Sequence, residues 1–197
     1  MPLVKTIRST GQIAHDPELY QTEQEYLQAF EALKKAEQSA IGELRVQAAQ
    51  LVDAAKIKLK LLGLNDALIR EIEKEGKADR SLLYSEPGEP VWLYVTIYEY
   101  EIPLVEVGQD IKVDVPSVPG KVFGGQVRAI DTVVNPVTRS IRVRAVLENP
   151  EGILKPDMYV NATIQIDLGI VLTVTAEAVF RTGEKDIVFV AKENGRF

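Results

Sequence analysis

The spacing of hydrophobic residues changes abruptly near residue 87, and this change constrains the fold more than any other feature. Between residues 19 and 62, apolar side chains recur every three or four positions, which is the spacing of an amphipathic helix. After Pro87, β-branched and aromatic residues alternate with polar ones, which is typical of strands. We therefore predict a mixed α and β chain in which a helical part precedes a β part.

The helical stripe is longer than an ordinary globular helix and contains an internal break. Asp16 can cap its start, and the small residues of "SAIG", 39–42, permit a turn between two antiparallel helices of roughly 20 residues each. Asn65 and Gly76 then delimit a short third helix. We expect a helical hairpin and a third helix within residues 15–80.

The β part offers several short strands separated by turns rich in Pro, Gly and Asn. The candidate strands are 91–98, 110–115, 125–134, 140–148 and 159–167. In the fourth, Ile141 and Val143 point to one face, and Arg142 and Arg144 point to the other. We predict a small closed antiparallel barrel over residues 88–168, with both arginines on its exposed face.

The two ends of the chain are expected to meet. Residues 169–197 contain a further hairpin signal around 182–185, and we predict that this segment pairs with an early strand at 6–13. The ends would then form one β-rich module, into which the helices are inserted.

Composition excludes several classes of protein. The net charge is −6 and the basic residues are scattered, so we expect no nucleic-acid partner. No cysteine is present, which excludes disulfides and Cys-ligated zinc. The opening segment has no apolar signal core, and we expect that any targeting segment has been removed.

Few residues suggest a catalytic, metal-binding or phosphate-binding site. His15 is the only histidine and cannot build a zinc or copper site alone, so we expect a loop residue, and we expect Met158 to be a packing residue. Glu99 and Glu101 could act as a catalytic carboxylate pair if strand geometry continues through them, but no supporting residues accompany them. Gly124 and Gly125 are not followed by a helix, which favours a bulge or tight turn over a phosphate loop. We predict no catalytic, metal-binding or cofactor-binding residue.

Three stretches carry a resemblance to a known family. "NPVTRSIRVRAVLENPEGILKPDMYVNATI" resembles the barrel of the periplasmic adaptor subunits, or membrane fusion proteins, of resistance-nodulation-division efflux pumps. "VWLYVTIYEYEIPLVEVGQDIKV" and "LKLLGLNDALIREIEKEGK" are similar to the heavy-metal (copper/silver-type) branch of that family, related to HlyD and CusB. The resemblance covers nearly the whole chain.

The resemblance implies an order of modules. Residues 1–14 would be a membrane-proximal strand, 15–80 the helical hairpin with its third helix, 88–168 the barrel and 169–197 a partial membrane-proximal module. The strands of the lipoyl-like module of this family are missing or reduced in this sequence. Asp157 stands where relatives tend to carry a turn glycine, and we expect the turn to survive because Asp tolerates a left-handed backbone.

The function implied by the resemblance is that of a non-enzymatic adaptor without a cofactor. It would link an inner-membrane pump to an outer-membrane TolC-like channel, in the periplasm of a Gram-negative bacterium, as a homo-oligomer engaged in heavy-metal cation efflux. The predicted contact residues are Ser39, Ala40, Ile41 and Gly42 in the hairpin turn and Arg142 and Arg144 on the barrel. The alternatives are a multidrug or type I secretion adaptor, a periplasmic ligand-binding module, and a periplasmic hydrolase that uses the two glutamates.

Overall fold

The computed structural model describes residues 2–39, 41–170 and 172–190. Contacts divide the chain into two units, Thr6–Ile166 and a smaller one that combines Met1–Lys5 with Asp167–Phe197. The larger unit contains the helices and most of the barrel. The smaller unit contains a two-stranded hairpin.

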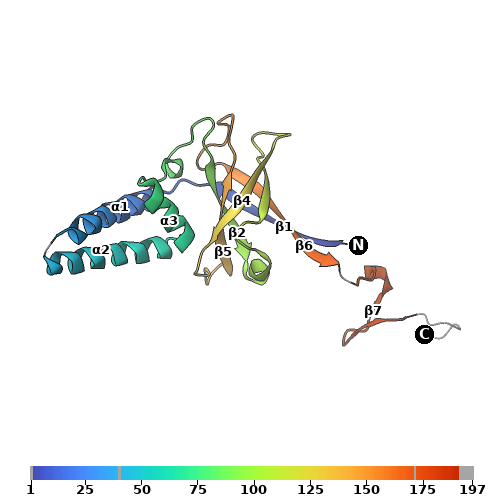
Figure 1. Cartoon of the computed structure of the whole chain (residues 1–197). Coiled ribbons are helices and arrows are strands. Elements are labelled where there is room, and N and C mark those ends of the chain that lie inside the picture. The colour runs from blue at the N-terminus through green and yellow to red at the C-terminus, as the bar shows by residue number, and fades with distance from the viewer. Residues whose placement is uncertain (1, 40, 171, 191–197) are drawn as a thin grey trace. The chain divides into compact units, whose positions relative to one another are not determined.

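Three helices follow the first strand. They are α1 (Pro17–Glu37), α2 (Gly42–Leu61) and α3 (Asp66–Glu75). Asp16 caps α1 by accepting a hydrogen bond from the Leu19 backbone N–H at 3.0 Å, and Asn65 caps α3 in the same way through Leu68 at 2.9 Å. Gly76 ends α3 with a left-handed backbone, φ +67°. The predicted hairpin and third helix are confirmed (Figure 1), and so are the caps at Asp16, Asn65 and Gly76.

Six antiparallel strands close into a barrel in the order β1-β2-β5-β4-β3-β6. They are β1 (Pro2–Ile13), β2 (Val91–Tyr98), β3 (Asp110–Asp114), β4 (Val122–Ile130), β5 (Ser140–Leu147) and β6 (Tyr159–Ile170), with the 3₁₀ helices η1 (Arg80–Leu82) and η2 (Glu99–Leu104) in the connections. The predicted mixed α and β fold with a small closed barrel is confirmed. The barrel has one strand more than predicted.

The additional strand is the early one, and its predicted place is wrong. Residues 6–13 were expected to pair with the chain's final segment in a membrane-proximal strand, 1–14, but Gly11 pairs with Val95 and Ile13 with Leu93 of the barrel. Ile7 and Ile13 are fully buried, and their burial in the barrel core explains why this strand belongs there.

The final segment of the chain forms the predicted hairpin by itself. Strand β7 (Val179–Arg181) pairs with β8 (Asp186–Val188), and the turn that connects them is closed by a hydrogen bond from the Thr182 N–H to the Lys185 carbonyl at 3.1 Å. Met1–Lys5 group with this region by contacts, so the expected association of the two ends applies only to the first few residues.

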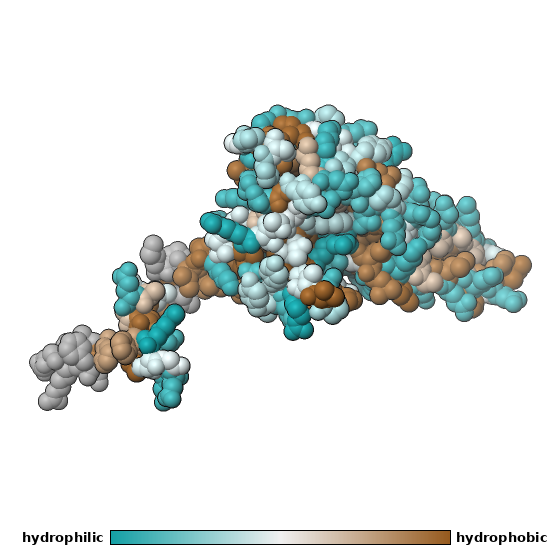
Figure 2. All heavy atoms as spheres, turned by 180° about the vertical axis from the view of Figure 1, so that it is seen from behind, coloured by the Kyte–Doolittle hydropathy of each residue, from teal (hydrophilic) through white to brown (hydrophobic). Residues whose placement is uncertain are grey.

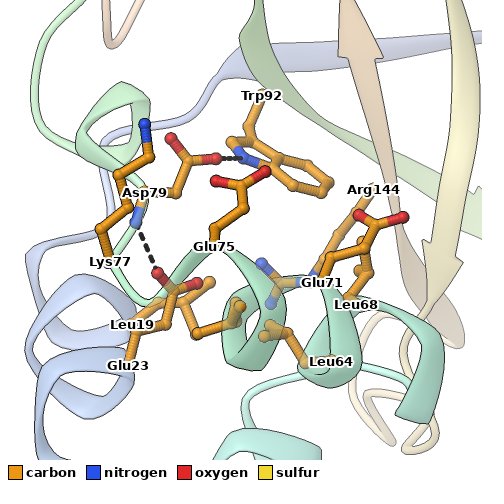
Figure 3. A pocket seen from close by; sticks show the side chains of 11 residues that line it. Leu19, Glu23, Leu64, Leu68, Glu71, Glu75, Lys77, Asp79, Trp92 and Arg144 are labelled. Atoms are coloured by element: carbon orange, nitrogen blue, oxygen red, sulfur yellow. Dashed lines mark hydrogen bonds between the residues drawn. The ribbon is translucent and has the colours of Figure 1, made fainter. Parts of the chain in front are cut away.

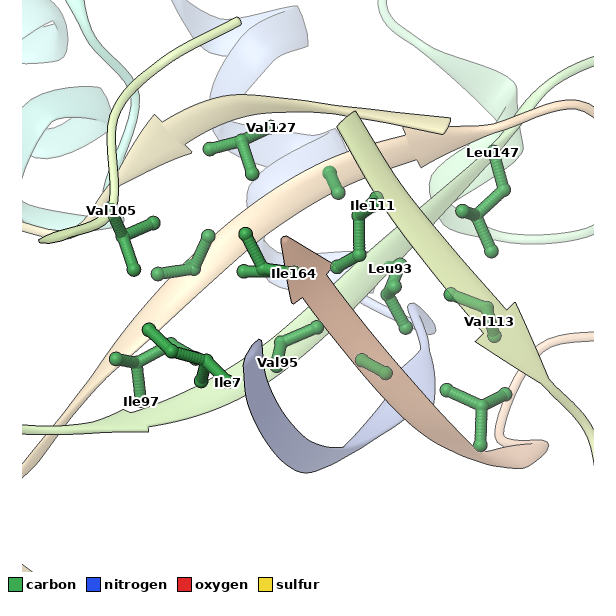
Figure 4. Packing of buried hydrophobic residues seen from close by; sticks show 14 of the residues in the cluster. Ile7, Leu93, Val95, Ile97, Val105, Ile111, Val113, Val127, Leu147 and Ile164 are labelled. Atoms are coloured by element: carbon green, nitrogen blue, oxygen red, sulfur yellow. The ribbon is translucent and has the colours of Figure 1, made fainter. Parts of the chain in front are cut away.

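The interior of the barrel is filled by apolar side chains from all six strands (Figure 4). Along β5 the inward side chains are Ile141, Val143, Ala145 and Leu147, as the alternation predicts. Gly125 is needed because a Cβ there would lie 2.2 Å from the Val146 carbonyl oxygen. The strand irregularity predicted at the glycines lies instead between Val127 and Ala129.

The helical part is attached to the barrel by short connections. Only residues 14–16 separate β1 from α1, and η1 is the sole regular element between α3 and β2. Neither connection contains a strand. Asp157 adopts the expected left-handed conformation, φ +66°, in the turn before β6.

Candidate functional site

The helices contact the barrel on the outer face of β2, β4 and β5. Trp92 and Tyr94 point outward from β2, opposite Val146 and Arg144 of β5. A second apolar cluster, separate from the barrel interior, packs against this face and includes Leu19, Leu59, Leu64, Leu68, Ile69, Ala129 and Trp92. We call the polar group at the edge of this contact the joint; it consists of Asp16, Leu62, Gly63, Tyr94, Asp131 and Arg144.

Arg144 is the centre of the joint, and its side chain is only 2% exposed. Its Nε donates to Asp131 Oδ1 at 3.1 Å, and its Nη2 donates to the Leu62 carbonyl at the end of α2. Nη1 lies 3.9 Å from Asp16 Oδ2 and makes no hydrogen bond. The Tyr94 ring centre is 4.4 Å from the guanidinium carbon. One cation therefore contacts the start of α1, the end of α2 and the barrel.

The prediction that Arg144 lies on an exposed face of the barrel is wrong. Alternation assigned it correctly to the outer face of β5, but the turn between α2 and α3 covers that face at this point. Arg142 is exposed as predicted. Its guanidinium carbon lies 5.0 Å from the centre of the Tyr94 ring. Of the two barrel candidates, only Arg142 is available to a partner.

Gly63 allows the end of α2 to approach the joint closely. Its backbone is left-handed, φ +95°, and a Cβ at this position would lie 2.0 Å from Asp131 Oδ1 and 2.8 Å from Arg144 Nε. Any side chain would therefore displace the ion pair as well as strain the backbone. The residue that the sequence identifies as a helix stop is thus also a packing requirement.

A buried carboxyl group lies beside the joint. Glu23 of α1 is 3% exposed, and burial raises its pKa to about 8, although a hydrogen bond from the Asp79 N–H at 2.8 Å opposes this shift. Asp79 also accepts a hydrogen bond from the Trp92 indole N–H at 2.6 Å (Figure 3). Glu23 consequently keeps its proton at neutral pH.

A cavity of about 70 Å³ lies between these groups. Figure 3 shows that Leu19 and Leu68 line it from α1 and α3 and Leu64 from the turn between α2 and α3, with Trp92 and Arg144 contributed by the barrel. Among the described residues, no group of three His, Cys, Asp or Glu side chains could hold a metal ion. The contacts around the cavity serve to connect the helices to the barrel.

The residues first considered for chemistry lie elsewhere and do not come together. His15 is exposed in the connection between β1 and α1, and Met158 packs against the barrel core, both as predicted. Strand geometry does not continue through Glu99 and Glu101, because β2 ends at Tyr98 and both glutamates lie in η2. Glu99 pairs with Arg139 at 2.9 Å.

The hairpin turn is exposed where the structure describes it. Ile41 is 58% exposed and Gly42 is exposed, whereas Ser39 is half-buried and Ala40 lies outside the described residues. Apolar side chains also emerge along α2, and they contribute to the brown patches among teal atoms on the helical part in Figure 2. The most exposed are Val46, Ile57 and Leu61. No helix of the described residues combines the length and the hydrophobicity needed to cross a membrane.

Sequence reasoning missed Glu23, Asp79, Asp131 and the buried position of Arg144. One available signal was Trp92, a large aromatic side chain on the outward positions of β2. An outward tryptophan next to an outward tyrosine indicates that another element covers the strand there.

Residues 90–167 match the family described as CusB-like, beta-barrel domain, which corresponds to the barrel from β2 to β6. Membrane fusion protein SilB of Salmonella typhimurium is 27% identical over 109 residues, covering 55% of this chain and 25% of SilB. Cobalt-zinc-cadmium resistance protein CzcB of Cupriavidus metallidurans is 26% identical over 183 residues, covering 88% of this chain and 35% of CzcB. The chain thus spans only a quarter to about a third of these relatives.

Among solved structures, ZneB from Cupriavidus metallidurans is 17% identical, with a TM-score of 0.44 over 84% of this chain and 100% of that chain. A TM-score of this size does not establish a common arrangement of the whole chain. The sequence matches confirm the predicted resemblance to the membrane fusion proteins and to their heavy-metal branch. Residues 90–167 match the CusB-like β-barrel domain, and the chain is similar to a protein described as a membrane fusion protein.

Proposed function

We propose that this chain is a periplasmic adaptor that links an inner-membrane resistance-nodulation-division pump to an outer-membrane channel during heavy-metal efflux. The observation that supports this most is the combination of a CusB-like barrel with a helical hairpin fixed to its outer face. The barrel would contact the pump, and the exposed hairpin turn around Ile41 would contact the channel.

The proposed activity is geometric and involves no catalysis. Shaped surfaces on a stable barrel suffice to hold two membrane proteins at a set distance, and several copies of the chain would surround the export path. The protein would work in the periplasm at the surface of the inner membrane of a Gram-negative bacterium. We expect no turnover from Glu99 and Glu101, because Glu99 is occupied by an exposed ion pair.

The proposed cargo is a heavy-metal cation of the copper or silver type. The sequence resemblance favours these ions, whereas the name of CzcB points to cobalt, zinc and cadmium. Growth of cells with and without the protein on graded amounts of each metal salt separates the two groups. Loss of copper or silver tolerance alone supports the proposal, and loss of drug tolerance without any metal effect would favour a multidrug adaptor.

Photo-crosslinking in cells tests the bridging role. A photoreactive residue at Ile41 should capture an outer-membrane channel, and one at Arg142 should capture the pump, since both positions are exposed. Cells that lack the channel provide the control for Ile41. If neither position captures a membrane protein while the chain is folded in the periplasm, the adaptor proposal is wrong and a ligand-binding module becomes the better reading.

A further inference from the structure

We propose that Arg144 is a positioning residue that locks the direction in which the hairpin leaves the barrel, so that the two move as one rigid body. The inference rests on contacts within Thr6–Ile166 and holds whether or not the proposed partners are correct. In an adaptor, such a lock would transmit a displacement of the barrel directly to the hairpin turn.

The first support is that Arg144 reaches both roots of the hairpin. Asp16, whose carboxylate lies 3.9 Å from Nη1, caps the start of α1, and the Leu62 carbonyl that accepts from Nη2 ends α2. A hydrogen bond at one root and a charge contact without a hydrogen bond at the other restrain the direction of this pair of helices. A third contact, to Asp131 at 3.1 Å, ties the same guanidinium to the connection between β4 and β5.

The second support is that the segments on both sides of Arg144 are held by hydrogen bonds and close packing. The Ala14 N–H donates to the Trp92 carbonyl, and the Asp16 N–H donates to the Leu82 carbonyl, both at 2.8 Å. The connection from β1 to α1 is therefore bonded at both of its ends. On the other side, Gly63 leaves no room for a side chain between α2 and the ion pair.

The third support is that the rest of the contact does not depend on Arg144. The apolar cluster buries Leu64, Leu68 and Ile69, and Asn65 donates to the Arg128 carbonyl at 2.9 Å. This packing should keep the helices on the barrel without the guanidinium, but apolar contacts are non-directional. Removing Arg144 should therefore loosen the direction of the hairpin and leave both parts folded.

The planar fork of arginine explains the choice of residue. Lysine presents one compact ammonium group and cannot bond the separate acceptors of the joint at the same time. Arg142 offers a matched control, since it lies two positions away on β5, contacts the same Tyr94 ring at 5.0 Å and remains exposed.

Distance measurement by double electron–electron resonance tests the lock. The chain has no cysteine, so spin labels attach only at introduced sites, such as Glu37→Cys on α1 and Lys112→Cys on the barrel. Wild type and Arg142→Met should each give one narrow distance peak. Arg144→Met should give a broad distance distribution instead. A label pair within the hairpin, Glu31→Cys with Gln47→Cys, should stay narrow in all three proteins.

A broad distribution in the wild type would overturn the proposal, as would a narrow one in Arg144→Met. If Arg144→Met does not fold, Asp131→Ala decides, since it removes the acceptor of the hydrogen bond from Arg144 Nε. Broadening of the distance distribution in Asp131→Ala supports the proposal, and an unchanged peak contradicts it.

Discussion

The barrel interior and the joint are both buried, yet they are built in opposite ways. The interior is apolar throughout and its residues come from alternate positions of regular strands. The joint places a cation and two carboxylates beside an apolar cluster, and the neutral carboxyl group of Glu23 lies next to it. The comparison indicates that the interior provides stability, whereas the joint provides a specific geometry, because charged groups are directional and costly to bury unpaired.

Truncating the barrel interior should give the largest effect. Leu93→Ala removes a fully buried side chain, and we expect it to lower the free energy of unfolding by about 2–5 kcal/mol. Leu44→Ala on the exposed face of α2 is the control and should change it far less. Urea unfolding measures the free energy of unfolding of both variants. Equal decreases would contradict the claim that the barrel interior contributes more to stability than the exposed face of α2.

Adding a methyl group to the joint should come next. Gly63→Ala must strain a left-handed backbone and also displace Asp131, at a cost of roughly 2–3 kcal/mol. Gly76→Ala has a similar backbone but open space around it, so it should cost about 1 kcal/mol. Thermal unfolding compares the two, and equal melting temperatures would show that the joint is not tightly packed.

The buried carboxyl group should make stability depend on pH. The pKa of Glu23 is raised from 4.5 to about 8, so between these values the unfolded chain releases a proton that the folded chain keeps. The free energy of unfolding therefore falls as pH rises through this window, and the contribution of the protonated group is lost above about pH 8.

Glu23→Gln stays neutral and can still accept from the Asp79 N–H, so it should flatten this dependence and stabilise the protein by about 2 kcal/mol at pH 6. Glu25→Gln, two positions along α1 and exposed, is the control. Urea unfolding at several pH values from 5 to 8 measures the slope. Identical slopes in wild type and Glu23→Gln would mean that Glu23 is ionised in the folded protein.

A surface ion pair should matter least. Lys121 Nζ lies 2.6 Å from Glu151 Oε2, but both side chains are well exposed to solvent. Lys121→Gln should therefore change the free energy of unfolding by no more than about 0.5 kcal/mol. If Lys121→Gln lowers the free energy of unfolding as much as Gly63→Ala does, the joint is no more important for stability than an exposed ion pair.

The same comparison explains what could be read from the sequence. The hairpin, its caps and five of the barrel strands follow from local patterns, since Asp16, Asn65 and Gly76 act on their immediate neighbours. The place of β1 could not be read in this way, because its partner is β2, some eighty residues away.

The joint was missed for a related reason. A period of two assigns Arg144 to the outer face of β5, but only the position of a distant turn, Leu62 to Leu64, decides that this face is covered. Glu23 likewise looks like an ordinary helix-surface residue until Asp79 and Trp92 enclose it. Buried polar sites between elements depend on tertiary contacts that no local pattern carries.

A doubly labelled chain tests the bridging role most directly. With photoreactive residues at both Ile41 and Arg142, irradiation of cells that carry the native pump and channel should yield a single covalent species containing all three proteins, identified by mass spectrometry. That result would show one chain in contact with both membranes' proteins at once. Species that join the chain only to copies of itself, or to one membrane protein from both positions, would contradict the account.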